Sequence, residues 1–341
     1  MQACEAPSVS DRVVAYDRAV QAGPCHYPVL VRIGRQAGEG LAEAVRGLGG
    51  ARFLVVAASG APARQLGAAV AALALVGKVL VVRGERVALR LPVPTPDTVV
   101  VAVGGGRTVR SVLGWARRGQ VVAVPTTLAA MSEAYVLPGS DGPRAPALLW
   151  CRPDLLDGPQ HAGLYPLLRD VLAICPYHLD SVAGRLRADG RYEPAVLASF
   201  VALCQEAQAG VLTFDPLGQG PAAVLRYGQG TAQGLLLAAL LGERLGLLGA
   251  EGVAAHLRLL ARAGLATELG PGPGAEVARE LVLLRALGRP RVAGGSVLTP
   301  VPAEEVRALR GFAAAPVPAP EVGRVDYPVP SARAARPTVA A

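Results

Sequence analysis

The sequence predicts an α/β domain followed by a helical domain. In the first half of the chain, valine-rich apolar runs alternate with amphipathic helical patterns, which is typical of a parallel sheet covered on both faces. In the second half the apolar residues recur almost only at helical spacing. A length of 341 residues also favours two domains over one small core.

The first half contains the elements of a Rossmann-like fold with a parallel sheet. Each apolar run is bounded by glycine, proline or a helical pattern, which separates strand from crossover helix. The expected elements are, in order, a strand at 27–34, a helix at 40–48, strand 51–59, helix 61–75, strand 78–84, strand 97–106, helix 107–119 and strand 120–127.

The second half predicts an all-helical domain. Helical periodicity recurs at 164–186, 193–212, 231–248, 252–265 and 275–288. Beyond residue 315 the chain is rich in Pro and Ala, and we expect a mobile or extended tail. The expected organisation is therefore an N-terminal extension at 1–26, an α/β domain at 27–141, a helical domain at 142–314 and a tail at 315–341.

Composition argues against several classes of function. The longest apolar runs, such as 67–77, are shorter than the roughly 18–20 residues that cross a bilayer. No secretory signal opens the chain, so we expect a soluble cytoplasmic protein without a membrane partner. The 34 basic residues include one lysine, Lys78, and are scattered, which argues against a nucleic-acid partner. The four histidines and five cysteines lack the short spacings of a zinc site.

A glycine turn follows the strand DTVVVAVGGG, at residues 97–106, and opens the next helix. Glycines let backbone N–H groups approach an anion, and a helix N-terminus adds partial positive charge. Gly104, Gly105 and Gly106 are therefore candidate ligands of a phosphate. A tight turn without any ligand is an equally good interpretation of these residues alone.

The surrounding stretch, VVVAVGGGRTVRSVLGWARRGQVVAVPTTLAA at 99–130, resembles the dinucleotide-binding segment of 3-dehydroquinate synthase and its relatives, the sugar phosphate cyclases. In that family the strand after the glycine turn ends in Pro-Thr-Thr-Leu, here residues 125–128. The resemblance continues, in the same order and with gaps, over 27–265. It implies a dehydroquinate synthase-like fold, a homodimer, and possible NAD binding through Gly104, Gly105, Gly106, Thr126 and Thr127.

Family members also hold a divalent metal with one glutamate and two histidines, and the resemblance places these ligands on other residue types here. The glutamate falls on Pro166, and the two histidines of a Gly-His-x-x-x-His motif fall on Gln229 and Gln233. A further histidine is missing or falls on Tyr227. Carboxamides are poor zinc ligands and proline is none, so zinc is not expected.

The charged residues of the family site also differ. The lysine after the metal glutamate falls on Arg169, and a helical lysine falls on Gln208. The aspartate after the glycine turn falls on Arg110, which reverses its charge, and the aspartate after Pro-Thr-Thr-Leu falls on Glu133. The segment before the glycine-turn strand, at 85–96, is shorter than in the family and removes part of the adenine-ribose wall.

Five residues are the candidates for catalysis. Tyr227 could donate a proton, and Gln229 and Gln233, four residues apart, would share a helix face and bind a carbonyl or enol oxygen. Arg169, with Asp170, could orient a carboxylate, or the two could bind one another. Glu133 completes the set. The alternative to these catalytic roles is that Tyr227 only packs in the interior and that Gln229 and Gln233 only form hydrogen bonds with the backbone or with water.

Three functions follow from these residues. The favoured one is a repurposed enzyme of bacterial natural-product metabolism, which acts on a small-molecule substrate in the interdomain cleft. It would catalyse a metal-independent ring-forming or eliminative step, of the cyclase or lyase class. The second is a non-catalytic protein that binds a metabolite or a partner enzyme. The third is retention of NAD-dependent carbocycle formation.

Overall fold

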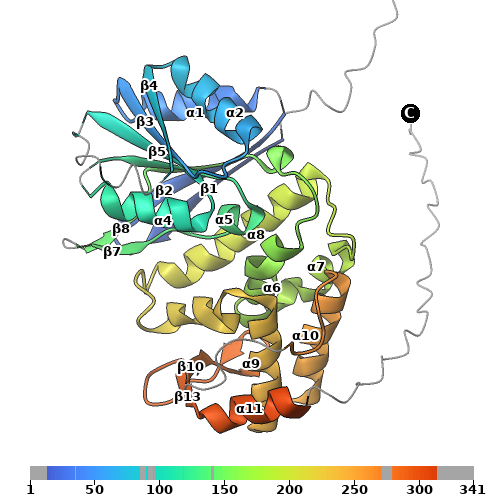
Figure 1. Ribbon diagram of the computed structural model, residues 1–341. Helices are drawn as coiled ribbons and strands as arrows, with labels where there is room; N and C mark the ends of the chain where they lie inside the picture. Colours follow the sequence, from blue (N-terminus) through green and yellow to red (C-terminus); the bar gives the residue numbers. More distant parts are fainter. Residues whose placement is uncertain are drawn as a thin grey trace, which may run out of the picture.

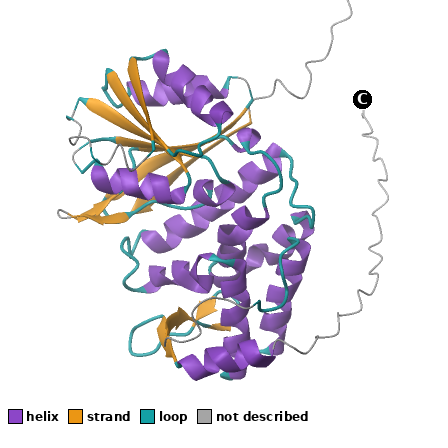
Figure 2. Cartoon of the chain, in the orientation of Figure 1, coloured by secondary structure: helices purple, strands orange, loops and turns teal. Residues whose placement is uncertain are grey.

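The computed structural model describes residues 14–34, 36–84, 90, 95, 97–117, 119–139, 142–270 and 279–312. A twisted sheet with helices on both faces lies at one end of the molecule, and a helical region lies against it (Figures 1 and 2). This arrangement confirms the predicted α/β fold class with a helical C-terminal region.

The sheet has seven strands in the order β1-β2-β9-β6-β5-β3-β4. All neighbouring pairs are parallel except β1 and β2, which form an antiparallel hairpin. Strands β3 and β5 are neighbours in the sheet. The chain continues from β3 to β4 on one side and from β5 to β6 on the other, so the strand order reverses between β3 and β5. Ligands of open α/β sheets bind at such reversals. The strands are β1 (Val14–Ala22), β2 (Cys25–Ile33), β3 (Arg52–Ala57), β4 (Lys78–Arg83), β5 (Thr98–Gly104), β6 (Val121–Pro125) and β9 (Leu148–Cys151).

The central strands are buried on both faces, which explains their uninterrupted apolar sequence. In β5, Val99, Val101 and Val103 pack with α1 (Ala37–Arg46) and α2 (Ala63–Ala74) on one face. On the other face, Val100 and Ala102 belong to a core that includes α4 (Gly106–Trp115) and the helical region. One continuous core therefore joins the sheet to the helices beneath it.

Among the described residues, the helical region has five α-helices before residue 265 and one after the last strands. Its longest helix, α8, packs against β1 and β2. By length and composition α8 could also cross a membrane, but half of the apolar window is buried in the fold. The helices are α6 (Tyr165–Ala173), α7 (Leu179–Arg185), α8 (Pro194–Leu212), α9 (Ala232–Arg244), α10 (Ala250–Arg262) and α11 (Ala303–Phe312).

The sheet extends past both expected boundaries of the α/β domain. Strand β1 lies within residues 1–26, and β9 lies beyond residue 141. Both strands are added through partners distant in sequence or by a hairpin, which a strand-helix alternation does not reveal. The tail at 315–341 lies outside the described residues, as does most of the segment at 85–96.

The helix predicted at 275–288 is wrong for its described part. Residues 279–286 form β10 (Arg279–Val282) and β11 (Leu284–Ala286), which pair with β13 (Leu298–Val301) and β12 (Arg289–Pro290). The run from Leu281 to Leu284 is wholly buried, and a short buried run has no period that separates strand from helix. A third small ribbon pairs β7 (Leu137–Gly139) with β8 (Gly142–Arg144).

Candidate functional site

The glycine turn lies at the point where the sheet topology reverses. Strand β5 ends at Gly104, Gly105 is the extended N-cap residue, and α4 begins at Gly106. The amide of Thr126, at the end of β6, donates to the carbonyl of Gly104 at 2.9 Å. The five residues predicted to bind a cofactor, Gly104 to Gly106 with Thr126 and Thr127, are therefore brought together at the carboxyl edge of the sheet.

A cavity of about 290 Å³ adjoins the two threonines. Its lining includes Gln65, Thr126, Thr127, Leu155 and Gln160. Gln65 fixes one wall, because its Nε2 donates to the carbonyl of Leu155 at 3.0 Å. Thr127 caps the short helix α5 (Leu128–Met131), and its Oγ1 accepts from the amide of Ala130. The cavity has the position of a ligand site in an open α/β sheet.

An ion pair lies beside the glycine turn. Nη2 of Arg110, on α4, is 2.7 Å from Oε2 of Glu133, which follows α5. The guanidinium of Arg110 also lies over the ring of Tyr135, 5.5 Å from its centroid. Tyr135 is fully buried, and its hydroxyl donates to the carbonyl of Ala130. Arg110 carries a positive charge where the family has an aspartate, and the carboxylate of Glu133 beside it neutralises that charge.

Arg169 and Asp170 bind one another, which was one of the two roles predicted for them. Both are buried, with the Arg169 Nε to Asp170 Oδ1 distance at 2.7 Å. Burial alone would lower the pKa of Arg169, but the Asp170 carboxylate raises it overall. Asp170 also accepts from Nε2 of Gln208 on α8, at 2.7 Å. The guanidinium of Arg169 additionally donates to the carbonyl of Leu225.

Tyr227 is fully buried and pairs with a histidine that the sequence analysis did not select. Its hydroxyl is 2.7 Å from Nε2 of His256 on α10. Nδ1 of His256 is 2.7 Å from the carbonyl of Gly252, so the proton lies on Nδ1 and Nε2 accepts from the tyrosine. Burial lowers the pKa of His256 to about 4. The sequence does contain a sign that His256 is buried. It lies on the apolar face of α10, together with the buried residues Val253 and Leu260.

Gln229 and Gln233 do not share a helix face. Gln229 has a φ of 49° in the non-helical break before α9, whose N-cap is Thr231. The glycines at 228 and 230 also have positive φ, which breaks the helix where four-residue spacing predicted its continuation. Gln233 lies in the first turn of α9, where its amide donates to the carbonyl of Glu268 and accepts from the amide of Gly270. Gln229 is exposed.

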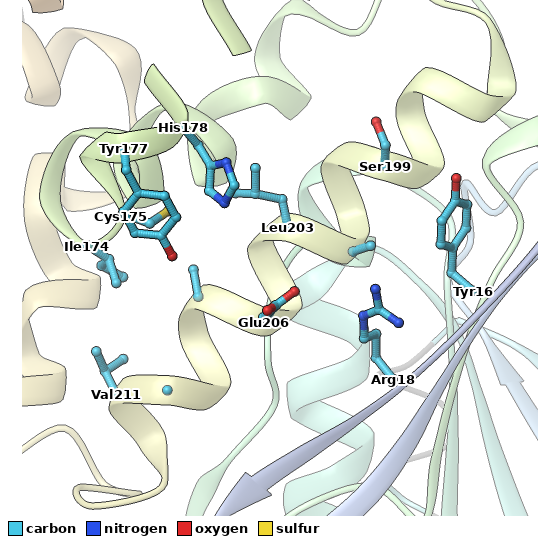
Figure 3. A pocket seen from close by; sticks show the side chains of 13 residues that line it. Tyr16, Arg18, Ile174, Cys175, Tyr177, His178, Ser199, Leu203, Glu206 and Val211 are labelled. Carbon is cyan, nitrogen blue, oxygen red and sulfur yellow. The ribbon is translucent and has the colours of Figure 1, made fainter. Parts of the chain in front are cut away.

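A second cavity, of about 400 Å³, lies away from these residues. It is bordered by β1, α8 and the turn before α7, with Tyr177, Glu206 and Arg18 along its length (Figure 3). None of the sequence-predicted site residues lines it, although His178, the histidine nearest the cleft in sequence, does. Its charged side chains are exposed to solvent.

Comparison with known proteins gives a consistent set of relatives. No protein-family model matches the chain. A 2-deoxy-scyllo-inosose synthase from Streptomyces lividus is 28% identical over 289 residues, covering 68% of this chain and 75% of the relative. The corresponding enzyme from Streptomyces kanamyceticus is 27% identical over 202 residues, covering 48% and 52%.

Solved structures share the fold over most of the chain. A 2-deoxy-scyllo-inosose synthase complexed with carbaglucose-6-phosphate, NAD+ and Co2+ aligns with a TM-score of 0.75 at 20% identity, covering 87% of this chain and 100% of that one. A 2-epi-5-epi-valiolone synthase from Streptomyces hygroscopicus subsp. jinggangensis, with NAD+ and Zn2+ bound, aligns with a TM-score of 0.65 at 17% identity, covering 84% and 96%.

Proposed function

We propose a function from one premise, which is that the chain belongs, as a divergent member, to the dehydroquinate synthase-like family of sugar phosphate cyclases. We infer that it is an enzyme of bacterial secondary metabolism. Its substrate would be a small polyol or sugar derivative, bound at the carboxyl edge of the sheet. The reaction would be a ring-forming or eliminative step that does not use a metal ion.

The donor set at the family's metal positions carries the metal-independent part of this proposal. Pro166 offers no donor atom, and both amide atoms of Gln233 are engaged by backbone groups of residues 268 and 270. Within the described ranges, no group of three or more His, Cys, Asp and Glu side chains is arranged to hold a metal ion. Carboxamides bind zinc weakly, so the residues present do not fit the family's divalent metal.

The groups that could perform chemistry without a metal are Glu133 and Arg110. A carboxylate suits the removal of a proton next to a carbonyl group, which is the step that eliminations and carbon–carbon ring closures share. A guanidinium can stabilise the oxyanion that forms when the proton leaves. Thr126 and Thr127, which line the cavity of about 290 Å³, offer hydroxyl groups that could orient the substrate.

Three of the candidates named from the sequence we now propose as supports of the cleft. Arg169 holds the 225 carbonyl and Asp170, and Tyr227 holds His256. Gln233 ties α9 to residues 268–270. Each of these contacts uses the polar atoms that a substrate would need. Gln229, which is exposed, remains a candidate substrate contact.

A non-catalytic role is the second candidate, and one observation favours it. Arg169, Asp170 and Gln208, at or beside family site positions, are engaged with one another and with backbone groups. A protein that kept the fold but only bound a metabolite or a partner enzyme would show this loss of open charged groups.

The proposed function is tested by metal analysis together with turnover. Purified protein would be incubated with hexose and heptulose phosphates and their unphosphorylated sugars, with and without EDTA, and the products followed by NMR. We expect substoichiometric metal and conversion that persists in EDTA. Glu133→Gln should slow conversion by about 100-fold or more, the usual contribution of a general base. Glu206→Gln, an exposed carboxylate on α8, is the matched control.

The outcomes of this experiment distinguish the proposed function from the two alternatives. Stoichiometric zinc or cobalt, or conversion that stops in EDTA, would contradict the metal-independent proposal and favour the family reaction. Conversion unaffected by Glu133→Gln would exclude Glu133 as the base, and a simultaneous test of Gln229→Ala would then locate the substrate contact. A protein that converts none of the substrates but binds one of them would favour the non-catalytic role.

A further inference from the structure

The glycine turn of this chain faces a carboxylate that the chain itself supplies. A Cβ placed on Gly106 would lie 3.2 Å from Oε2 of Glu133 and 3.2 Å from Nη1 of Arg110. In a helix the Cα–Cβ bond leans toward the N-terminus, so these two atoms lie beside the first turn of α4, next to the glycine turn. An anion received by the glycine turn would lie next to this ion pair.

Arg110 reaches this space because it lies one turn further along α4. Long helical side chains fold back toward the N-terminus, which brings its guanidinium to the first turn. A positive charge at a helix N-terminus is unfavourable unless an anion lies beside it. Oε2 of Glu133 supplies that anion at 2.7 Å. The site thus combines an arginine, the helix dipole and an internal carboxylate.

Glu133 is held in this position from the opposite side by α8. Its carbonyl accepts from Nε2 of Gln205 at 3.0 Å, and the next amide, of Ala134, donates to Oε1 of Gln208 at 2.8 Å. The guanidinium of Arg110 lies over the ring of Tyr135, 5.5 Å from its centroid. The carboxylate is therefore pre-positioned, and its effective concentration at the turn is high.

Packing accounts for one of the three glycines without any ligand. A Cβ on Gly104 would lie 2.7 Å from Cβ of Thr108, a distance that real side chains do not adopt. Glycine is required there so that the strand can pack against the helix. A glycine in this turn is therefore not by itself a sign that a dinucleotide binds.

We propose that the Glu133 carboxylate, oriented by Arg110, takes the place of the anionic phosphates at the glycine turn, so that the protein does not bind NAD+. A dinucleotide would have to displace the carboxylate from Arg110 and accept an uncompensated negative charge beside its own phosphates. The cofactor that the family uses does not fit the turn while the pair is formed. This inference goes beyond the proposed function, which assigns Glu133 and Arg110 to the reaction, because it concerns NAD+ binding and is tested without turnover.

The test is direct titration of the purified full-length protein with NAD+ by isothermal titration calorimetry. We expect no saturable binding to the natural protein at about 1 mM NAD+, which corresponds to a binding free energy weaker than about −4 kcal/mol. Glu133→Ala should gain saturable binding, tighter by about tenfold or more, because the internal competitor is removed. Arg110→Gln should not gain it, because the carboxylate remains and its partner is lost.

Two controls make the outcome decisive. Glu206→Ala removes an exposed carboxylate elsewhere and corrects for the change in net charge, so it should behave as the natural protein does. Glu133→Gln replaces Glu133→Ala if circular dichroism shows that the latter does not fold. Saturable NAD+ binding by the natural protein at micromolar concentration would overturn the proposal. So would a failure of both folded Glu133 variants to bind NAD+ more tightly than the Glu206→Ala control.

Discussion

At the scale of single residues, Tyr227 and His256 in the helical region use their polar atoms in hydrogen bonds within the protein. The hydroxyl of Tyr227 and both ring nitrogens of His256 are used in one buried chain of hydrogen bonds that ends at the carbonyl of Gly252. An unpartnered polar group in such a place costs about 1–3 kcal/mol, so each member keeps the others in place. Tyr227 is thereby fixed as part of the core.

The buried histidine predicts a loss of stability in mild acid. The folded state holds His256 neutral, with a pKa of about 4, whereas an exposed histidine titrates at 6.5. Below pH 6.5 the unfolded chain binds a proton that the native state does not. The free energy of unfolding should therefore fall as the pH drops, by about 3 kcal/mol in total between pH 6.5 and pH 4.

The measurement is urea denaturation at several pH values, comparing the natural protein with His256→Gln. The variant should lack this component, so the difference between the two curves should narrow below pH 6.5. His26→Gln, at an exposed position on β2, is the matched control and should keep the natural pH dependence. Parallel pH curves for the natural protein and His256→Gln would show that His256 is not held neutral.

At the scale of elements, helix α8 fixes the loop that carries Glu133. Nε2 of Gln208 donates to the carbonyl of Ser132 and to Oδ2 of Asp170, and its Oε1 accepts from the amide of Ala134. Helix α5 has only four residues, so it cannot hold the following loop by its own hydrogen bonds. Two glutamines of α8, Gln205 and Gln208, supply partners for its last carbonyl groups.

This arrangement predicts that Gln208→Ala is strongly destabilising. The substitution leaves a backbone carbonyl, a backbone amide and the Asp170 carboxylate short of one partner each. The expected loss in the free energy of unfolding is about 3 kcal/mol, measured by urea denaturation. Glu206→Ala, two residues earlier and exposed, should change it by less than about 0.5 kcal/mol. Equal stabilities of the two variants would mean that water replaces the glutamine.

The elements that the sequence predicted correctly are those with a strong local pattern. The valine-rich strands β3, β5 and β6 and helices α8 and α10 lie where the patterns indicate. The wrong or missed elements depend on pairing with another segment of the chain. Strand β1 is added by a hairpin, and residues 279–286 become strands because 298–301 and 289–290 pair with them. Local periodicity contains no information about such pairing.

The candidate site shows the same limit. The grouping of Gly104 to Gly106 with Thr126 and Thr127 follows from strands that end at one edge of a sheet, which sequence order predicts. The pairing of Arg110 with Glu133 and of Tyr227 with His256 joins residues 23 and 29 positions apart. Side-chain packing across elements decides these pairs, and no spacing rule of a single element contains it.

At the scale of the whole molecule, the two halves share one core. A single cluster of buried residues runs from Val20, Val29 and Val100 in the sheet to Leu168, Leu236 and Leu259 in the helices. Hydrogen bonds cross the same boundary, from Gln205 and Gln208 on α8 to the loop after α5. Because the core and these hydrogen bonds are shared, neither half can unfold without breaking the contacts of the other.

The protein should therefore unfold in one cooperative transition, although chains of this length often do not. Its two tryptophans, Trp115 and Trp150, both lie in the sheet half, so their fluorescence reports on the sheet. Far-ultraviolet circular dichroism reports mainly on the helices. The two urea curves should coincide in midpoint and slope, because loss of either half exposes the apolar surface of the other. A fluorescence transition at lower urea than the helical one would show that the sheet opens first, and the shared core would then contribute less than the packing within each half.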